Sequence, residues 1–135
     1  MDEIGRKLVK LSEELKKEKI AEMPEWARFV KTGVSREKVP IQDNWWQLRS
    51  ASVLRKVYLN GPIGAERLSN HFGGRKNRGS KTDKVFPGST KILRVILQQL
   101  EAGGLVEQSK TAKKGRILTK KGFEYISKSG LERLK

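Results

Sequence analysis

The residues of this chain best suited to chemistry are the lysines and arginines between positions 71 and 91. Six cations stand there against one acid, Asp83, so the stretch has a local net charge of +5. The cations are Arg75, Lys76, Arg78, Lys81, Lys84 and Lys91. Gly73, Gly74 and Gly79 let the backbone approach another surface closely. We predict a polyphosphate partner; the alternative is a solvated or disordered surface loop.

The composition of the whole chain agrees with a polyanionic partner. Its 135 residues contain 30 Lys and Arg against 15 Asp and Glu, which gives a formal net charge of +15 at pH 7. Such an excess points to nucleic acid or to an anionic membrane surface. Residues 1–23 hold six acids and six bases, so the whole excess lies from Pro24 onward. The length suits one compact domain with one core.

Catalytic and metal chemistry find little support in the sequence. The chain has no cysteine and one histidine, His71, which excludes disulfides, thiolate catalysis and a histidine-rich metal site. It contains no phosphate-binding motif of the Gly-x-x-x-x-Gly-Lys-Ser/Thr type, and its acids show no paired-carboxylate spacing. We therefore expect no enzymatic activity, no cofactor and no metal site.

The sequence also argues against a membrane partner. No run approaches the roughly 18 to 20 apolar residues that span a bilayer, and no signal peptide is visible, so we expect a soluble, cytoplasmic protein. An apolar stripe near the N-terminus, with spacings of 4, 3 and 4, predicts a helix packed on the rest of the domain, and docking on a partner is the alternative. Its residues are Ile4, Leu8, Leu11 and Leu15. Membrane binding by this helix is disfavoured because its polar face is neutral and lacks Trp or Phe anchors.

Two further helices are predicted before position 60. Pro24 begins a short helix that places Trp26, Phe29 and Val30 on one face, towards the core. Residues 34–42 have no periodicity and are predicted to form an extended connector. Asp43 is then the predicted N-cap of a helix over residues 44–60 that is apolar around most of its circumference. The remaining strip of this helix carries Trp45, Arg49, Ser52 and Lys56, with Arg55 at its edge.

Two interpretations of this strip stay open. Arg49 and Arg55 contact a polyanion, or they form internal ion pairs, although acids are scarce nearby. Trp45 lies on the binding surface, or it packs against the preceding connector.

The next part of the chain predicts a short helix, a long loop and a third helix. Residues 64–72 form the short helix, with Ala65, Leu68 and Phe72 facing inward. The sixteen residues 73–88 are then predicted to form the basic loop. Ser89 is the predicted N-cap of the third helix. Its apolar stripe contains Ile92, Leu93, Ile96, Leu97 and Leu100, and its opposite face carries Lys91, Arg94 and Gln98.

The C-terminal part predicts a β-hairpin followed by a helix. Residues 105–108 and 116–119 are strand candidates, joined by a turn that holds Lys110, Lys113 and Lys114. A last helix from Thr119 is predicted to carry the apolar residues Phe123, Ile126, Leu131 and Leu134.

This order of elements predicts a mainly α fold: a winged-helix-like domain with a small β-hairpin wing and additional N-terminal helices. Residues 1–42 hold the N-terminal helices and connector, and residues 43–135 hold the winged-helix core. Most winged helices read DNA by inserting the third helix into the major groove, after a short turn. The long basic loop before this third helix argues against ordinary groove insertion. A DNA-binding winged-helix transcriptional regulator is nevertheless the alternative.

Four motifs occur in order along the chain. They are Pro-Glu-Trp-Ala-x-Phe-Val-Lys-Thr-Gly (residues 24–33), Trp-Trp-x-x-Arg-x-Ala-Ser-x-x-Arg-Lys-Val-Tyr-Leu (residues 45–59), Gly-Gly-Arg-Lys-x-Arg-Gly (residues 73–79) and Gly-Ser-x-x-Ile-x-Arg-x-x-Leu-Gln-Gln-Leu-Glu (residues 88–101). In these motifs the chain closely resembles the S-nineteen-e (S19e) family of archaeal and eukaryotic small-subunit ribosomal proteins, and its length and lysine-rich style resemble an archaeal member.

The resemblance implies a winged-helix-like fold and a place in the head of the small ribosomal subunit. It also implies binding to the 3′ part of the small-subunit ribosomal RNA and a role in subunit maturation. On the matching positions it points to Arg49, Arg55, the Gly-Gly-Arg loop and Arg94 as the RNA-facing set. Residues 81–86 depart from the family pattern, in which a loop with more proline and histidine is expected.

The residue chemistry and the resemblance together predict binding without catalysis. Arginine can engage phosphate with two hydrogen bonds or stack on a base, whereas lysine acts as a point charge. Positioned contacts are assigned to Arg49, Arg55, Arg75, Arg78 and Arg94, and looser phosphate neutralisation to Lys76, Lys81, Lys84, Lys113 and Lys114. Trp45, Lys56 and Lys91 complete the predicted set. The expected partners are ribosomal RNA and other small-subunit proteins, with a monomer outside the ribosome.

Overall fold

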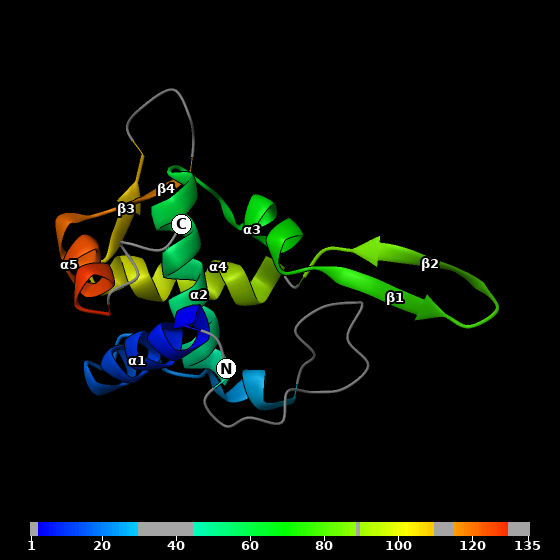
Figure 1. Cartoon of the computed structure of the whole chain (residues 1–135), viewed down its shortest axis with the longest axis horizontal. Coiled ribbons are helices and arrows are strands. Elements are labelled where there is room, and N and C mark those ends of the chain that lie inside the picture. Colours follow the sequence, from blue (N-terminus) through cyan, green and yellow to red (C-terminus); the bar gives the residue numbers. More distant parts are fainter. Residues whose placement is uncertain (1–2, 30–44, 89, 110–114, 130–135) are drawn as a thin grey trace.

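The computed structural model describes residues 3–29, 45–88, 90–109 and 115–129 of the chain. Within these residues the fold is mainly α-helical, with two short antiparallel sheets (Figure 1). In chain order the elements are α1 (Glu3–Lys17), the 3-10 helix η1 (Glu25–Phe29), α2 (Trp45–Asn60), α3 (Ala65–His71), β1 (Gly74–Arg78), β2 (Lys81–Phe86), α4 (Thr90–Ala102), β3 (Val106–Gln108), β4 (Arg116–Leu118) and α5 (Lys120–Ser129).

Helix α2 is the centre of the core, and α1, α4, α5 and β4 all pack against it. Its predicted apolar circumference is confirmed, because Trp46, Ala51, Val53, Leu54 and Val57 are buried. The predicted stripe of α4 is confirmed in full, since all five of its apolar residues are at most 1% exposed. Burying side chains at a spacing of three and four residues fixes which face of each helix remains for a partner.

The N-terminal helix docks on its own domain, as predicted. Leu11 and Leu15 are buried, and Ile4 and Leu8 pack against the core from a half-buried position. The chain after α1 then crosses α2 and α4, where the side chain of Gln47 donates a hydrogen bond to the carbonyl oxygen of Ala21 (3.0 Å). These contacts make α1 part of the same core as the winged helix.

The predicted short helix after Pro24 is confirmed as η1, in the 3-10 form. The ring of Trp26 meets the ring of Trp46 edge to face, with centroids 5.9 Å apart. Several sequence predictions lie outside the described residues: Val30, the connector at 34–42, the N-caps Asp43 and Ser89, the division of the chain after residue 42, Lys110, Lys113, Lys114, Leu131 and Leu134.

The winged-helix order α2, α3, α4, β3, β4 and α5 is confirmed. Strands β3 and β4 pair antiparallel, and Val106 of β3 is buried against the core. Arg116 also pairs with Ile63, just before α3, through two backbone hydrogen bonds of 3.0 and 3.3 Å. The Thr119 hydroxyl donates to the carbonyl oxygen of Gly104 (2.6 Å) and accepts from the Gly122 amide (3.2 Å), so a threonine starts α5, as predicted.

One sequence prediction is wrong. Residues 73–88 are not a loop, because most of them form the hairpin β1–β2, which turns at Gly79 and Ser80 with φ +72° at Gly79. Positive φ at a turn glycine matches the twist of a two-residue hairpin. Of the apolar residues on the last helix, Ile126 is buried and Phe123 is 46% exposed. The buried positions of α5 are Gly122, Ile126 and Ser129, which lie on another face of the helix.

None of the helices within residues 3–29, 45–88, 90–109 and 115–129 is both long and apolar enough to cross a membrane.

Candidate nucleic-acid interface

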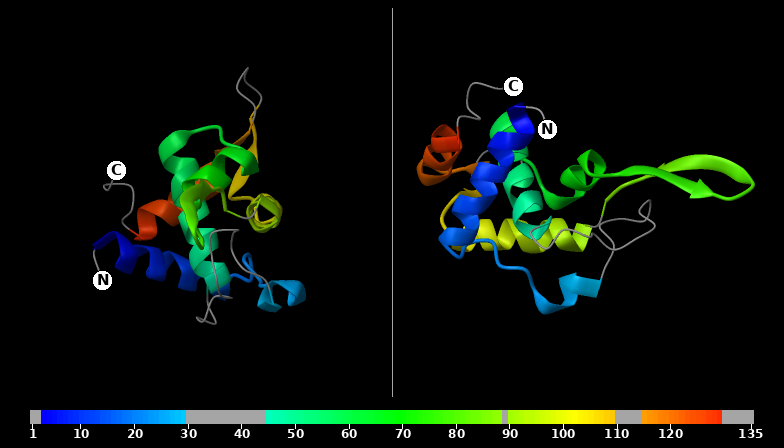
Figure 2. Two further views of the ribbon diagram at one scale, coloured as in Figure 1. Left: turned by 90° about the vertical axis from the view of Figure 1, so that its right-hand side faces the viewer. Right: turned by 60° about the horizontal axis from the view of Figure 1, so that its bottom comes forward.

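The most prominent cationic feature is the hairpin β1–β2 with its turn, residues 74–86, here called the arm. The arm leaves the helical body between α3 and α4 and extends away from it in the views of Figures 1 and 2. It carries five cations and one acid: Arg75, Lys76, Arg78, Lys81 and Lys84 against Asp83. The Lys84 side chain is exposed. The five cations of the predicted loop are therefore held on one extended ribbon.

The base of the arm is fixed tightly to α3. The backbone amide of Gly88 donates a 2.7 Å hydrogen bond to the carbonyl oxygen of Ser69. Gly88 is buried, and a Cβ atom at this position would lie 2.9 Å from the carbonyl oxygen of Phe72, closer than real Cβ contacts allow. Only glycine therefore fits where the chain returns from the arm to the body.

Arg49 joins helix α2 to the base of the arm. Its guanidinium carbon lies 4.3 Å from the centroid of the Phe72 ring, directly after α3. A cation over an aromatic face at this distance is attracted to the ring and held in one place. Arg49 is half-buried, so the stem of its side chain packs against the body of the protein.

The predicted polar face of α4 is confirmed, because Lys91, Arg94 and Gln98 are all exposed. The Lys91 Nζ lies 4.6 Å from the Trp26 ring centroid and so connects the first turn of α4 to η1. Arg94 is on the next turn along the same helix. The N-terminal end of α4 follows the arm directly, so these cations and the arm occupy one end of the molecule (Figure 1).

Three other predicted residues of α2 have different surroundings. Trp45 is only 8% exposed, with its ring centroid 5.5 Å from that of Trp46, so it packs in the core. Arg55 and Lys56 are half-buried. The Nε of Arg55 is buried and has no hydrogen-bond partner among the described residues. None of the contacts found in the described part of the chain joins Arg55 to Arg49 or to the arm.

Arg116 forms an ion pair that was not predicted from the sequence. Its Nε donates to a carboxylate oxygen of Glu101 at 3.3 Å, which ties β4 of the wing to the end of α4. The supporting roles of Phe72, Trp26 and Gly88 were likewise not predicted from sequence. Each depends on a contact between residues far apart in the chain, and periodicity within one element carries no signal for such contacts.

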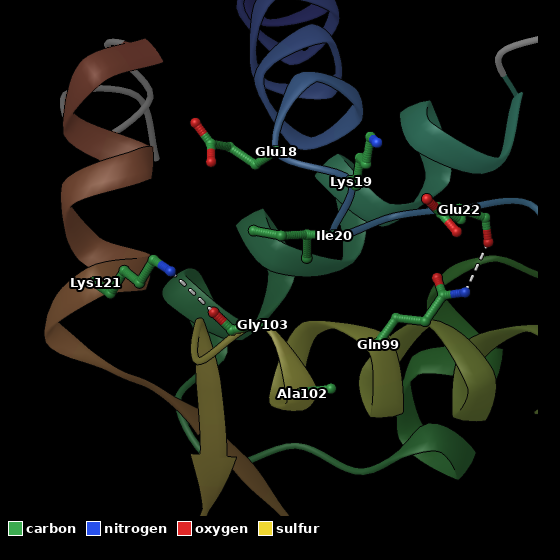
Figure 3. A pocket seen from close by; sticks show the side chains of 8 residues that line it. All are labelled: Glu18, Lys19, Ile20, Glu22, Gln99, Ala102, Gly103 and Lys121. Atoms are coloured by element: carbon green, nitrogen blue, oxygen red, sulfur yellow. Dashed lines mark hydrogen bonds between the residues drawn. The ribbon is translucent and has the colours of Figure 1, made fainter.

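The opposite, C-terminal end of α4 holds a pocket, shown in Figure 3. Its lining is mixed in charge: Glu18, Lys19, Ile20, Glu22, Gln99, Ala102, Gly103 and Lys121. Gln99 and Lys121 already donate hydrogen bonds to the carbonyl oxygens of Glu22 (2.7 Å) and Gly103 (3.2 Å). Within the described residues there is also no group of three or more His, Cys, Asp or Glu placed to hold a metal ion. The end of the molecule that holds the arm, Arg49, Lys91 and Arg94, here called the basic end, is therefore the candidate interface.

Comparison with known proteins gives one consistent result. The family model for ribosomal protein S19e matches residues 5–132. The small ribosomal subunit protein eS19 of Thermoplasma volcanium is 43% identical over 125 residues, which cover 93% of this chain and 81% of that protein. The eS19 proteins of Haloarcula marismortui and Entamoeba histolytica are 44% and 40% identical over 117 residues; these cover 83% and 87% of this chain, and 74% of each relative.

Proposed function

Because the chain belongs to the ribosomal protein S19e family, and is thus a structural component of the small ribosomal subunit in the cytoplasm, we propose that it binds ribosomal RNA through the basic end described above. The observation that carries this proposal is the arm itself. It places five cations on a ribbon outside the helical body, beside Arg49 and the first turns of α4. An extended cationic ribbon can follow a phosphate backbone that a flat helical surface cannot reach.

The physical properties of folded RNA fit this arrangement. An A-form helix hides its base edges in a deep, narrow groove, so proteins recognise it mainly through shape, phosphates and 2′-hydroxyl groups. Arg49 and Arg94 are placed to make positioned contacts, since arginine can bind phosphate with two hydrogen bonds. Lys56, Lys84 and Lys91 would add looser neutralisation. The same holds for the other cations of the arm and for Lys113 and Lys114 of the wing.

The alternative of a DNA-binding regulator has no support from the comparisons, in which the relatives named are small ribosomal subunit proteins. The structure offers a physical reason in the same direction. An arm of thirteen residues stands directly before α4, where a groove-reading helix needs free access to DNA. Contact with other small-subunit proteins, a place in the subunit head and a role in subunit maturation belong to the same proposal. They can be tested by co-sedimentation and by counting mature subunits after depletion.

The test of RNA binding is the affinity of the purified full chain for small-subunit ribosomal RNA, measured against salt. If about five cations contact phosphates, the logarithm of the affinity should fall against the logarithm of salt concentration with a slope of roughly −3.5 to −4.5. Arg94→Ala should weaken binding and assembly while the fold stays intact, because Arg94 is exposed. Arg94→Lys should restore only part of the affinity, since the planar fork is lost.

The matched control is Lys128→Ala, which removes one exposed cation from α5, far from the arm (Figure 1). Equal losses for Arg94→Ala and Lys128→Ala would show that total charge, and not the basic end, determines binding. Tight duplex-DNA binding that survives deletion of the arm, without ribosome association, would overturn the proposal as a whole.

A further inference from the structure

The pairing of the two arm strands places like charges opposite each other. Strands β1 and β2 are antiparallel, with register partners Gly74↔Phe86, Arg75↔Val85, Lys76↔Lys84 and Arg78↔Lys81. Two of these four pairs join a cation to a cation. Like charges on directly opposite residues destabilise an antiparallel pair, whereas opposite charges stabilise it.

The architecture of the arm gives it little stability to set against this repulsion. A hairpin of two strands is marginally stable in water unless it packs against another element. Each strand of the arm has the other as its main packing partner, and the arm extends away from the helices (Figure 1). A β-bulge or irregularity also interrupts the ladder between Lys76 and Arg78.

The two like-charge pairs lie in the outer half of the arm. The pair Gly74↔Phe86 is at the base, next to Gly88 and its 2.7 Å hydrogen bond to Ser69. The pairs Lys76↔Lys84 and Arg78↔Lys81 follow towards the turn. The arm therefore has a fixed base and an outer half whose pairing is opposed by its own charge.

From this register we infer that the outer half of the arm is a phosphate-dependent hairpin: closely spaced phosphates of the RNA backbone relieve the repulsion and complete the strand pairing. This inference rests on the proposed function and adds the chemistry of the ligand and its effect on the arm. The recognised group is an array of phosphates and not a base sequence. The repulsion that weakens the free arm is the same charge density that attracts RNA, so arm stability and RNA affinity oppose each other.

This opposition gives a test with two readouts of opposite sign. Lys84→Glu turns the pair Lys76↔Lys84 into an opposite-charge pair. In the free full chain, hydrogen exchange of the arm amides should become about 2- to 30-fold slower, because a repulsive pair is replaced by an attractive one. Affinity for small-subunit ribosomal RNA at about 0.1 M salt should fall at least about fivefold, since one phosphate contact is lost and repulsion is added.

The control variant is Lys128→Glu, which changes the charge equally at an exposed position of α5. It should leave arm exchange unchanged and weaken RNA binding less than Lys84→Glu does. Protection of α4 amides, measured in the same experiment, reports whether each variant keeps the fold. Inorganic polyphosphate, which has no bases, should slow exchange of the arm in the wild-type chain and have a smaller effect in Lys84→Glu.

The outcomes separate the inference from the function on which it rests. If Lys84→Glu weakens RNA binding but leaves arm exchange unchanged, the phosphate-dependent hairpin is wrong and the RNA-binding proposal stands. If Lys84→Glu does not change RNA affinity, the assignment of the arm as the RNA-binding element is wrong. If polyphosphate has no effect on the arm while ribosomal RNA protects it, the ligand chemistry is base recognition, which also overturns the inference.

Discussion

The side chain of Gln99 holds together three parts of the core, and its removal should have a defined energetic cost. Its Oε1 accepts a 2.9 Å hydrogen bond from the indole nitrogen of Trp46. Its Nε2 donates a 2.7 Å hydrogen bond to the carbonyl oxygen of Glu22, in the segment that leads from α1 to η1 (Figure 3). The change Gln99→Leu keeps a side chain of similar size and removes both bonds.

The two bonds should differ in what their loss costs. Trp46 is fully buried, so its indole N–H would be left without a partner, at about 1 to 3 kcal/mol. The bond to Glu22 is at the exposed surface, where water can replace the lost donor at little cost. We therefore expect Gln99→Leu to lower the free energy of unfolding by about 1 to 3 kcal/mol, nearly all of it through Trp46.

A double-mutant cycle with Trp46→Phe, measured by denaturant titration, tests this assignment. Phenylalanine has no N–H to satisfy, so Gln99→Leu in the Trp46→Phe background should cost less than about 0.5 kcal/mol, and the coupling energy should be at least about 1 kcal/mol. Gln98→Leu, at an exposed position of the same helix, is the control and should stay within about 0.5 kcal/mol of wild type. Equal costs of Gln99→Leu in both backgrounds would refute the reasoning.

Three further predictions address the core and its pH dependence. Leu97→Ala should lower the free energy of unfolding by about 2 to 5 kcal/mol in denaturant titration, because Leu97 is fully buried; a loss under about 0.5 kcal/mol would contradict this. Gly122→Ala should cost about 1 to 3 kcal/mol by the same method, since an added Cβ would overlap the carbonyl oxygen of Leu105. Burial, and secondarily two nearby glutamates, raise the pKa of Tyr125. The stability that the protonated Tyr125 side chain contributes is therefore fully present below about pH 10 and is lost as the pH rises through the higher pKa of the folded state. Tyr125→Phe should therefore lose less stability than wild type between neutral and strongly alkaline pH.

The helical core could be predicted from sequence because its burial repeats with the period of the helix. All five residues of the α4 stripe are buried, and the stripe of α1 lies against the core. Helix α5 is an exception, because apolar character alone does not predict which of its residues are buried. Phe123 is apolar and nevertheless exposed, whereas Gly122 occupies the position that packs on Leu105, where no larger residue fits. The ring of Phe123 instead lies beside Tyr58, with centroids 6.0 Å apart.

The candidate site was predicted in its residue types but not in its geometry. The exposed cations of α4 followed from the helical period, since they lie opposite a buried stripe. The packing of Arg49 on Phe72 and of Lys91 on Trp26 joins residues 23 and 65 positions apart, and only the folded chain shows it. The core position of Trp45 depends in the same way on its neighbours in space, because polar residues share its strip of α2.

A comparison of the two hairpins shows why the strands of the arm could not be predicted from the sequence. The wing was predicted, and its strand β3 has Val106 buried against the core, so part of its sequence is dictated by packing. The arm packs mainly on itself, so no alternation of apolar and polar residues is required of it, and its cations mask the strand signal. Neither core packing nor strand pairing accounts for the sequence of the arm. We therefore expect its residues to reflect binding to a partner outside the chain. Local rules of structure are expected to fail at functional sites, and here the failure falls on the five cations proposed to contact RNA.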